Sequence, residues 1–250
     1  MVKFQIASDL HIEYKNNIIP DPEKYIVPNC KNLILAGDVG SLYKYEQLKG
    51  FLEKLCSLFE TVLYVPGNNE FYMQKDYTPL NLYTLEARMR NLENEIENLY
   101  FLDKTSVKID NVCIAGCTLW SDPKCNLPKF IVKIHGINNN IYKSKFLKDV
   151  EYIKKVTKYC NDKNLKLLLI THHLPTYDII PESRKADRFI SLYASDLNNL
   201  IKTSKIHTWV CGHIHKNFNT TFNNTKFISN QYGKPKDNIN DFQKNFIIEV

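Results

Sequence analysis

Five short apolar runs along the chain are each followed within three residues by Asp, Asn or His, and this regularity restricts the fold more than any other feature. The runs cover residues 3–8, 32–36, 61–65, 165–171 and 207–211. Runs of this length, rich in branched aliphatic and aromatic residues, are typical of buried strands. Amphipathic stretches between them indicate an α/β fold. We therefore expect polar side chains to gather at the carboxyl edge of the strands, where α/β sheets bind ligands.

The rest of the chain divides into helices, further strands and one irregular insertion. Apolar residues at helical spacing predict helices at 46–59, 82–99, 145–161 and 196–202. Further strands are predicted at 106–109, 112–119, 217–222, 225–229 and 245–250, with Asn223-Asn224 as a hairpin turn. Mixed Pro, Asn and Lys predict an irregular insertion at 121–144. No Pro-, Gly- or Ser-rich linker interrupts the sequence, so we expect a single domain over residues 1–250.

The charge of the chain argues only weakly for a nucleic-acid partner. The formal net charge is +6, but its basic side is mostly Lys, with Arg only at positions 88, 90, 184 and 188. Arg is the residue best suited to forked phosphate contacts. A solvated Lys surface is therefore the better interpretation, and nucleic-acid binding is not favoured. The sequence gives no indication of the oligomeric state.

The cysteines and the apolar content point to an intracellular protein without a membrane anchor. Seven Cys are present, an odd number, and no Cys-x-x-Cys pair occurs. Several lie in apolar surroundings such as Val112-Cys113-Ile114, which predicts buried free thiols in a reducing, cytoplasmic compartment. The chain enters a strand pattern at Val2, so we expect no signal peptide. No apolar run approaches the ~20 residues that a membrane span needs.

The residues that follow the five runs are the candidate metal ligands. They occur in five pieces: Asp9-x-His11, Gly37-Asp38, Gly67-Asn68, His172-His173 and Gly212-His213-Ile214-His215. Each piece alone has an ordinary explanation, such as a surface turn or a buried histidine with a hydrogen-bond partner. Five such pieces at successive strand ends are not readily explained in that way. The set instead predicts a metal cage.

The chemistry of these residue types favours two cations over one. The Asp38 carboxylate has two oxygens and can bridge a pair of ions, and the alternating His213 and His215 can reach one ion each. Imidazole suits Mn, Fe, Zn and Ni, of which we favour Mn. Two cations ~3.5–4 Å apart can clamp phosphoryl oxygens and generate hydroxide between them.

In this order the motifs resemble those of the calcineurin-like metallophosphoesterase superfamily. Its pattern is Asp-x-His, Gly-Asp, Gly-Asn-His-Asp/Glu, His and Gly-His-x-His, and the resemblance covers residues 4 to about 229. It implies a two-sheet β-sandwich flanked by helices. It also implies that one metal is held by Asp9, His11 and His215, a second by Asn68, His172 and His213, and that Asp38 bridges them.

The sequence departs from the family pattern at Asn69. Family members usually carry His there, and the resemblance implies that this His contacts the phosphate and protonates the leaving group while the next acid, here Glu70, orients it. Asn can donate a hydrogen bond but cannot deliver a proton, a loss of ~10²–10⁴ in rate. Three explanations remain open: an engineered substitution, a natural one with another acid such as His173, or a chain that has lost most turnover.

Three functions therefore follow from the sequence. The first is a phosphoesterase that hydrolyses a small phosphomonoester or phosphodiester by attack of a metal-bridging hydroxide. The second is a catalytically impaired binding or scaffold protein on the same fold, and the third is a nuclease. Residues 121–144 and 174–190 are expected to form the wall of the site. In or next to these segments lie the aromatic residues Trp120, Tyr142 and Tyr177 and the basic residues Arg184, Lys185 and Arg188. The aromatic rings would stack on a base if the ester is nucleotide-like, or they could be ordinary loop packing.

Overall fold

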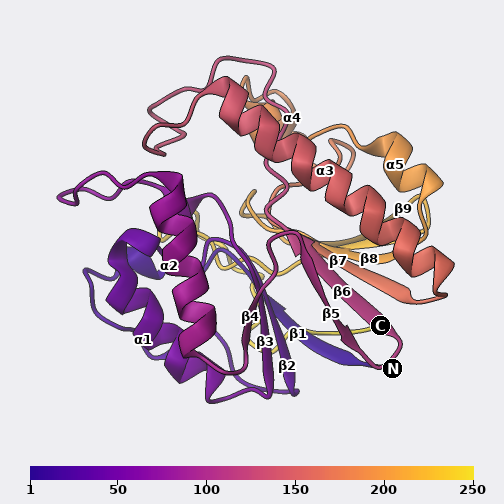
Figure 1. The fold of residues 1–250 in the computed structure, drawn as a ribbon, viewed down its shortest axis with the longest axis horizontal. Helices are drawn as coiled ribbons and strands as arrows, with labels where there is room; N and C mark the ends of the chain where they lie inside the picture. The colour runs from indigo at the N-terminus through magenta and orange to yellow at the C-terminus, as the bar shows by residue number, and fades with distance from the viewer.

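The computed structural model describes all 250 residues and contains two mixed β-sheets packed face to face, with helices on their outer faces (Figure 1). The first sheet has the order β11-β1-β2-β3-β4, and the second has the order β5-β6-β7-β8-β10-β9. The strands are β1 (Lys3–Ala7), β2 (Asn32–Ala36), β3 (Thr61–Val65), β4 (Leu99–Phe101), β5 (Thr105–Ile109), β6 (Val112–Cys117), β7 (Lys166–Thr171), β8 (Ile206–Val210), β9 (Phe218–Phe222), β10 (Thr225–Ser229) and β11 (Ile247–Glu249). The predicted fold class is confirmed.

The helices lie in two groups, one outside each sheet (Figure 1). The first sheet is covered by α1 (Tyr45–Cys56) and α2 (Leu82–Glu95), and the second by α3 (Asn139–Asp162) and α5 (Asn198–Thr203). A short α4 (Glu182–Lys185) lies in the connection after β7. Single 3₁₀ turns occupy Ile12–Tyr14, Pro22–Lys24, Leu42–Lys44, Asn69–Phe71 and Ile190–Leu192. None of the helices combines the length and the apolar character that crossing a membrane requires.

Alternation of side chains along each strand builds one core between the sheets and another beneath the helices. Phe4, Ile34 and Leu63 of the first sheet pack in the same buried cluster as Ile114 and Leu168 of the second. The residues between them in sequence face the opposite way and belong to the larger core that includes the helices. Because successive strand side chains point to opposite faces, strands buried on both sides read as continuous apolar runs.

Parallel pairing directs the ends of the central strands to one edge of the molecule. β1, β2, β3 and β4 are parallel to their neighbours, as are β6, β7, β8 and β10. Only β5, β9 and β11 at the sheet margins are antiparallel.

The predicted hairpin turn is present: Asn223 and Asn224 have φ of 48° and 63° between β9 and β10, as a two-residue turn of this kind requires.

Two element boundaries differ from the sequence prediction by four residues or more. The predicted helix 82–99 stops at Glu95, and Leu99 begins β4, which pairs with Val62 of β3. Leu99 continues the helical spacing of apolar residues, so only the tertiary pairing separates the two elements. The helix predicted at 145–161 begins at Asn139 instead, inside the expected irregular insertion. The side chain of Asn138 caps it by accepting a hydrogen bond from Ile141 N–H at 2.9 Å.

The seven cysteines are free thiols, and five of them are buried. Burial raises the pKa of Cys56 and of Cys211 to about 12, so these side chains remain protonated and unreactive at neutral pH.

A buried carboxylate on α3 should make the stability of the protein depend on pH. Asp149 accepts a hydrogen bond from Trp120 N–H at 3.3 Å and lies 3.5 Å from the Lys104 ammonium. Burial raises its pKa to about 6, from 3.8, although Lys104 opposes the change. The folded chain therefore holds this proton more tightly than the unfolded chain. The resulting stabilisation is complete below pH ~4 and is lost as the pH rises through 6.

Asp149→Asn should remove this pH dependence. Relative to the wild type, the free energy of unfolding of the variant should rise by roughly 1 kcal/mol between pH 5 and pH 8, as urea titrations at both values would measure. Asp103, a half-buried carboxylate that also pairs with Lys104, supplies the control. An Asp103→Asn variant that gave the same pH-dependent difference would contradict the assignment to Asp149.

Candidate metal centre

The seven predicted ligands come from five strand ends that belong to both sheets. Asp9 and His11 follow β1, Asp38 follows β2 and Asn68 follows β3, all in the first sheet. His172 follows β7, and His213 and His215 follow β8, in the second sheet. Six of the seven are buried, and His213 is half-buried. The packing of the two sheets therefore completes the cluster.

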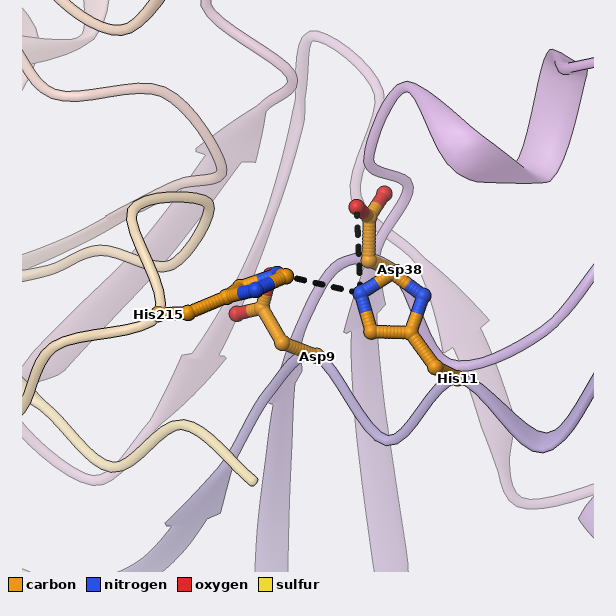
Figure 2. Close-up of side chains that lie close together, drawn as sticks. All are labelled: Asp9, His11, Asp38 and His215. Carbon is orange, nitrogen blue, oxygen red and sulfur yellow. Dashed lines mark hydrogen bonds and ion pairs between the residues drawn. The ribbon is translucent and has the colours of Figure 1, made fainter. Parts of the chain in front are cut away.

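The first group of ligand atoms is formed by Asp9, His11, Asp38 and His215, whose donor atoms all lie within 4.8 Å of one another. Figure 2 shows the rings of His11 and His215 directed toward each other, with Nε2 atoms 3.1 Å apart. His215 Nε2 lies 3.3 Å from Asp9 Oδ1, and His11 Nε2 lies 3.8 Å from Asp38 Oδ2. Two imidazoles and two carboxylates are a suitable donor set for a divalent transition metal.

The second group is formed by Asp38, His172 and His213. His172 Nε2 lies 3.3 Å from Asp38 Oδ1 and 3.2 Å from His213 Nδ1. Asn68 joins this group, since its Oδ1 lies 3.1 Å from His172 Nε2. Asp38 thus directs one oxygen to each group, the geometry that a bridging carboxylate requires.

Each of the four imidazoles is held from outside by an acceptor on its second ring nitrogen. His11 Nδ1 lies 2.9 Å from Glu13 Oε1, and His172 Nδ1 lies 2.8 Å from the Ala36 carbonyl. His215 Nδ1 pairs with Asp237 Oδ2, and His213 Nε2 lies 3.3 Å from the Leu192 carbonyl. An outer N–H donated in this way leaves the lone pair of the inner nitrogen free for a metal.

Asp237 and Glu13 were not among the sequence-predicted site residues, and Asp237 gives a direct test of the outer contacts. Asp237→Asn removes the carboxylate that orients His215, so the affinity for Mn²⁺ should fall about 10–100-fold while the fold is kept. Isothermal titration calorimetry with Mn²⁺ measures this change. Asp241→Asn is the matched control, because Asp241 is exposed and accepts only from Asn217 at 2.8 Å. Equal losses in both variants would contradict the role of Asp237.

Five of the ligands have left-handed backbones. Asp9, His11, Asp38, His213 and His215 have φ between 49° and 77°. This conformation costs a residue with a side chain roughly 1–2 kcal/mol, and such residues cluster at functional sites. It turns the chain sharply at the strand end, so that side chains only two positions apart reach the same site.

Two of the motif glycines are needed because the strand ends approach each other closely. A Cβ at Gly37, where φ is 90°, would lie 2.3 Å from His172 Nδ1, and one at Gly67 would lie 2.2 Å from Asp38 Oδ1. Any larger residue at either position would displace a ligand. The Gly-Asp and Gly-Asn pairs thus allow the chain to turn after the strand, and they also allow neighbouring strand ends to lie close together.

Glu70 joins the β2 and β3 ends from beneath the site. Its carboxylate accepts hydrogen bonds from the backbone N–H of Asp38 at 3.1 Å, Val39 at 2.7 Å and Gly67 at 2.8 Å, and from the Tyr64 hydroxyl. Burial and the Asp38 carboxylate raise the pKa of Glu70 to about 7. Glu70 lies 1% exposed, so it acts through the loops that it holds.

Asn69 is placed between Asp38 and the open side of the site. Its backbone N–H donates to Asp38 Oδ1 at 2.8 Å, and its side-chain amide donates to Asp38 Oδ2. It also lines the cavity above the ligands. Both hydrogen bonds fix the carboxylate shared by the two groups.

The His173 side chain is buried beside the ligands and does not line the cavity. The residue is 1% exposed, and its Nδ1 atom lies 3.3 Å from the Thr118 carbonyl oxygen. Its ring packs against that of His213, with ring centroids 4.2 Å apart. Burial and the neighbouring His172 lower its pKa to about 3. Neutral at physiological pH and outside the cavity lining, it is poorly placed to donate a proton.

The charges of the buried carboxylates favour cation binding. Burial opposes ionisation of Asp9 and Asp38, but His215 and His172 lower the pKa of Asp9, and His172 and His11 lower that of Asp38 well below its usual value. Both carboxylates are therefore ionised at neutral pH. Two buried negative charges surrounded by oriented imidazoles match the requirements of metal ions.

A cavity of about 430 Å³ opens above the ligands. Its floor includes Asp38, Asn68, Asn69, His213 and His215, and its walls carry the aromatic residues Tyr14, Tyr72, Phe130 and Tyr193 and the basic residues Lys133, Arg184, Lys234 and Lys236. Cavities of this size hold small molecules.

The expected wall segments line the cavity, but with other aromatic residues than those named from the sequence. Phe130 lies in 121–144 and Arg184 in 174–190, as expected. Trp120 and Tyr142, in contrast, are 3% and 2% exposed and pack together in the core with ring centroids 5.2 Å apart. Tyr177 does not line the cavity either. Burial of a large aromatic ring contributes strongly to stability, so such a residue can pack into the core even when it lies in a segment predicted to be a loop.

Comparisons with known proteins agree with this architecture. The family model for calcineurin-like phosphoesterases matches residues 2–217. An uncharacterized protein of Acanthamoeba polyphaga mimivirus is 26% identical in an alignment 269 positions long, and the alignment covers 94% of this chain and 93% of the relative.

Two solved structures resemble the fold. Phosphopantetheinyl hydrolase from Mycobacterium tuberculosis has a TM-score of 0.73 and 16% identity, with 99% of this chain and 95% of that chain covered. A putative 5'-nucleotidase from Staphylococcus aureus, in complex with alpha-ketoglutarate, has a TM-score of 0.51 and 14% identity over 91% of this chain and 48% of that chain.

This family uses divalent metals, and the buried Asp and His cluster could bind them. Since the family model spans most of the residues and the two-sheet fold agrees with it, the chain belongs to the calcineurin-like phosphoesterases.

Proposed function

We propose that the protein is a two-metal phosphoesterase that hydrolyses a small phosphomonoester or phosphodiester. The observation that carries this proposal is the pair of ligand groups sharing Asp38 at the floor of a small-molecule cavity. One cation would be held by Asp9, His11, His215 and Asp38. The other would be held by Asn68, His172, His213 and the same Asp38.

Divalent cations in such a pair supply Lewis acidity to the phosphoryl oxygens and activate a water for in-line attack. The residues around the ligands hold these ligands in position. Glu70 holds the loops that carry Asp38, and Asn69 fixes the carboxylate itself. The second amide hydrogen of Asn69 is available to a phosphate oxygen in the cavity. With Mn²⁺ as the favoured metal, imidazole, carboxylate and amide donors are all acceptable ligands.

The aromatic wall supports an ester with a flat or extended organic group, such as a nucleotide. Tyr14, Tyr72 and Tyr193 lie beside the ligand groups, and aromatic side chains stack on bases. The two structural neighbours are a phosphopantetheinyl hydrolase and a putative 5'-nucleotidase, and both names refer to small phosphate esters.

One observation favours a second candidate, a binding protein with weak turnover. Asn69 stands where an acid would be expected, and His173 is not positioned to replace it. In that case the metal sites would be intact but hydrolysis of natural esters would be slow.

Metal content and hydrolysis of two nitrophenyl esters test the proposal together. After loading with Mn²⁺, we expect two ions per chain by elemental analysis, and hydrolysis of either nitrophenyl phosphate or bis-nitrophenyl phosphate above the metal-free rate. Nitrophenolate leaves without a proton, so this assay does not depend on an acid. A protein with two ions and no activity on either ester would support the binding protein, and a protein that binds no metal would refute both.

A further inference from the structure

The cavity wall carries four basic residues from three separate segments of the chain. Lys133 lies in the connection before α3, Arg184 lies on α4, and Lys234 and Lys236 follow β10. None of the four forms an ion pair with Asp or Glu, whereas the neighbouring Lys185 pairs with Glu182 at 2.8 Å. Unpaired positive charges gathered around one cavity attract an anionic ligand.

One phosphate does not account for this much positive charge. On the proposed function, two divalent cations bring four positive charges, which the carboxylates of Asp9, Asp38, Glu13 and Asp237 balance. Glu13 and Asp237 count here because each accepts a hydrogen bond from an imidazole that is neutral when it binds a metal. A phosphate dianion then balances two of the four basic side chains, and two positive charges are left for a further anionic group.

The segment 232–237 holds two of these lysines in a fixed relation to the metal centre. Tyr232 N–H donates to the Ser8 carbonyl at 3.0 Å, and Gly233 N–H donates to the Asp9 carbonyl at 2.9 Å. Lys234 N–H donates to Asp237 Oδ2 at 2.8 Å, and Asp237 N–H donates to the Lys234 carbonyl at 2.9 Å. The loop is thus bonded to the first metal-ligand loop and closed on itself. Such anchoring reduces the entropy lost when its lysines bind an anion.

This segment lies beyond residues 2–217, which the family model matches. Lys133 is placed by a different contact, since its carbonyl accepts a hydrogen bond from Met73 N–H at 2.7 Å. Arg184 lies over the ring of Tyr193, with Cζ 5.7 Å from the centroid.

We propose that this basic wall, formed by Lys133, Arg184, Lys234 and Lys236, binds a second phosphate of the substrate, so that the preferred substrate is a small ester carrying two or more phosphate groups. The proposal rests on the proposed function for the position of the first phosphate. The cavity volume of about 430 Å³ favours a small molecule over a nucleic acid.

Binding of phosphonates, which resist hydrolysis because a P–C bond replaces the ester oxygen, tests this proposal without turnover. The probes are methylphosphonate and a series of alkane bisphosphonates with two to four methylene groups, titrated calorimetrically into the Mn²⁺-loaded protein. We expect the best bisphosphonate to bind the wild type at least about tenfold more tightly than methylphosphonate, as charge-assisted contacts to lysine would produce.

Lys234→Gln combined with Lys236→Gln should abolish this preference and leave the affinity for methylphosphonate within about twofold. Lys185→Gln is the matched control and should keep the preference, since Lys185 lies outside the cavity and already has a partner. Equal affinities of the wild type for both probe classes would overturn the proposal, as would a double variant that retains the preference or loses both affinities equally.

The same protein distinguishes failure of this proposal from failure of the proposed function. Absence of nitrophenyl ester hydrolysis would count against the phosphoesterase alone, because phosphonate binding does not require turnover. A salt-dependent gel shift with single-stranded DNA, lost in the double lysine variant, together with no preference for bisphosphonates, would assign the basic wall to nucleic acid and overturn the small-substrate proposal.

Discussion

Asp38→Asn should empty both metal sites together and reduce hydrolysis of nitrophenyl phosphate by about 10³-fold or more. Asp38 is the one residue common to the two ligand groups, with Oδ1 3.3 Å from His172 and Oδ2 3.8 Å from His11. An amide offers only one oxygen and no charge, so it cannot bridge. Loss of metal stabilisation amounts to several kcal/mol of transition-state energy, and every 1.4 kcal/mol is tenfold in rate.

Asp9→Asn provides the comparison, because Asp9 belongs to the first group only. Elemental analysis after loading with Mn²⁺ should find close to one ion per chain in this variant and less than one in Asp38→Asn. Circular dichroism should show that both variants keep the fold. If each variant lost a single ion, the two groups would not share Asp38 as a bridge.

Asn69→His should accelerate hydrolysis of esters with poor leaving groups far more than hydrolysis of nitrophenyl esters. An alkoxide or ribose oxygen needs a proton to depart, and an imidazole at the open side of the site can supply it. The gain expected of a general acid is up to ~10²–10⁴. Metal occupancy should hardly change, since Asn69 is not among the predicted ligands and its backbone N–H, which donates to Asp38 Oδ1 at 2.8 Å, is kept in the variant. Rates on an alkyl and a nitrophenyl phosphate, compared in both proteins, measure the effect.

His173→Ala separates the two accounts of the missing acid. With its pKa lowered to about 3 by burial and by His172, and with its ring against His213, His173 should affect both ester classes equally through packing. A rate collapse confined to poor leaving groups would instead identify His173 as the acid. No gain from Asn69→His on any ester would mean either that another residue such as His173 already serves as the acid or that the protein is not a catalyst, and His173→Ala in the Asn69 background separates these two.

The positions of the candidate ligands at the strand ends could be predicted because the apolar runs that mark these ends are local in the sequence. A buried strand with both faces covered is an apolar run, and the residue after it is exposed to the edge of the sheet, so Asp9, Asp38 and His172 could be placed together without knowledge of the sheet order. The sequence also predicts which element each ligand follows. It does not predict the left-handed backbones that aim them.

Arg184 of the basic wall was named from the sequence, but the outer contacts and the lysines of the wall could not be predicted, for a different reason. Asp237 reaches His215 across 22 positions, and Lys234 reaches the cavity only because segment 232–237 is bonded to Ser8 and Asp9. No periodicity marks such residues, since they are polar, lie in a loop and act through tertiary contacts. Trp120 was misplaced for a related reason, because loop residues can fill a core when an adjacent helix such as α3 covers them.

The left-handed ligand positions also bear on how such a protein would change over evolutionary time. Asp9, His11, Asp38, His213 and His215 each hold a conformation that glycine adopts without cost. In a lineage released from selection for metal binding, replacement of a ligand by glycine would both relieve strain and remove a buried charged or polar group. Ligand loss in that lineage should therefore be favoured by stability and not merely tolerated. Under the proposed metal binding, the five left-handed ligand residues are therefore positions at which function and stability oppose each other.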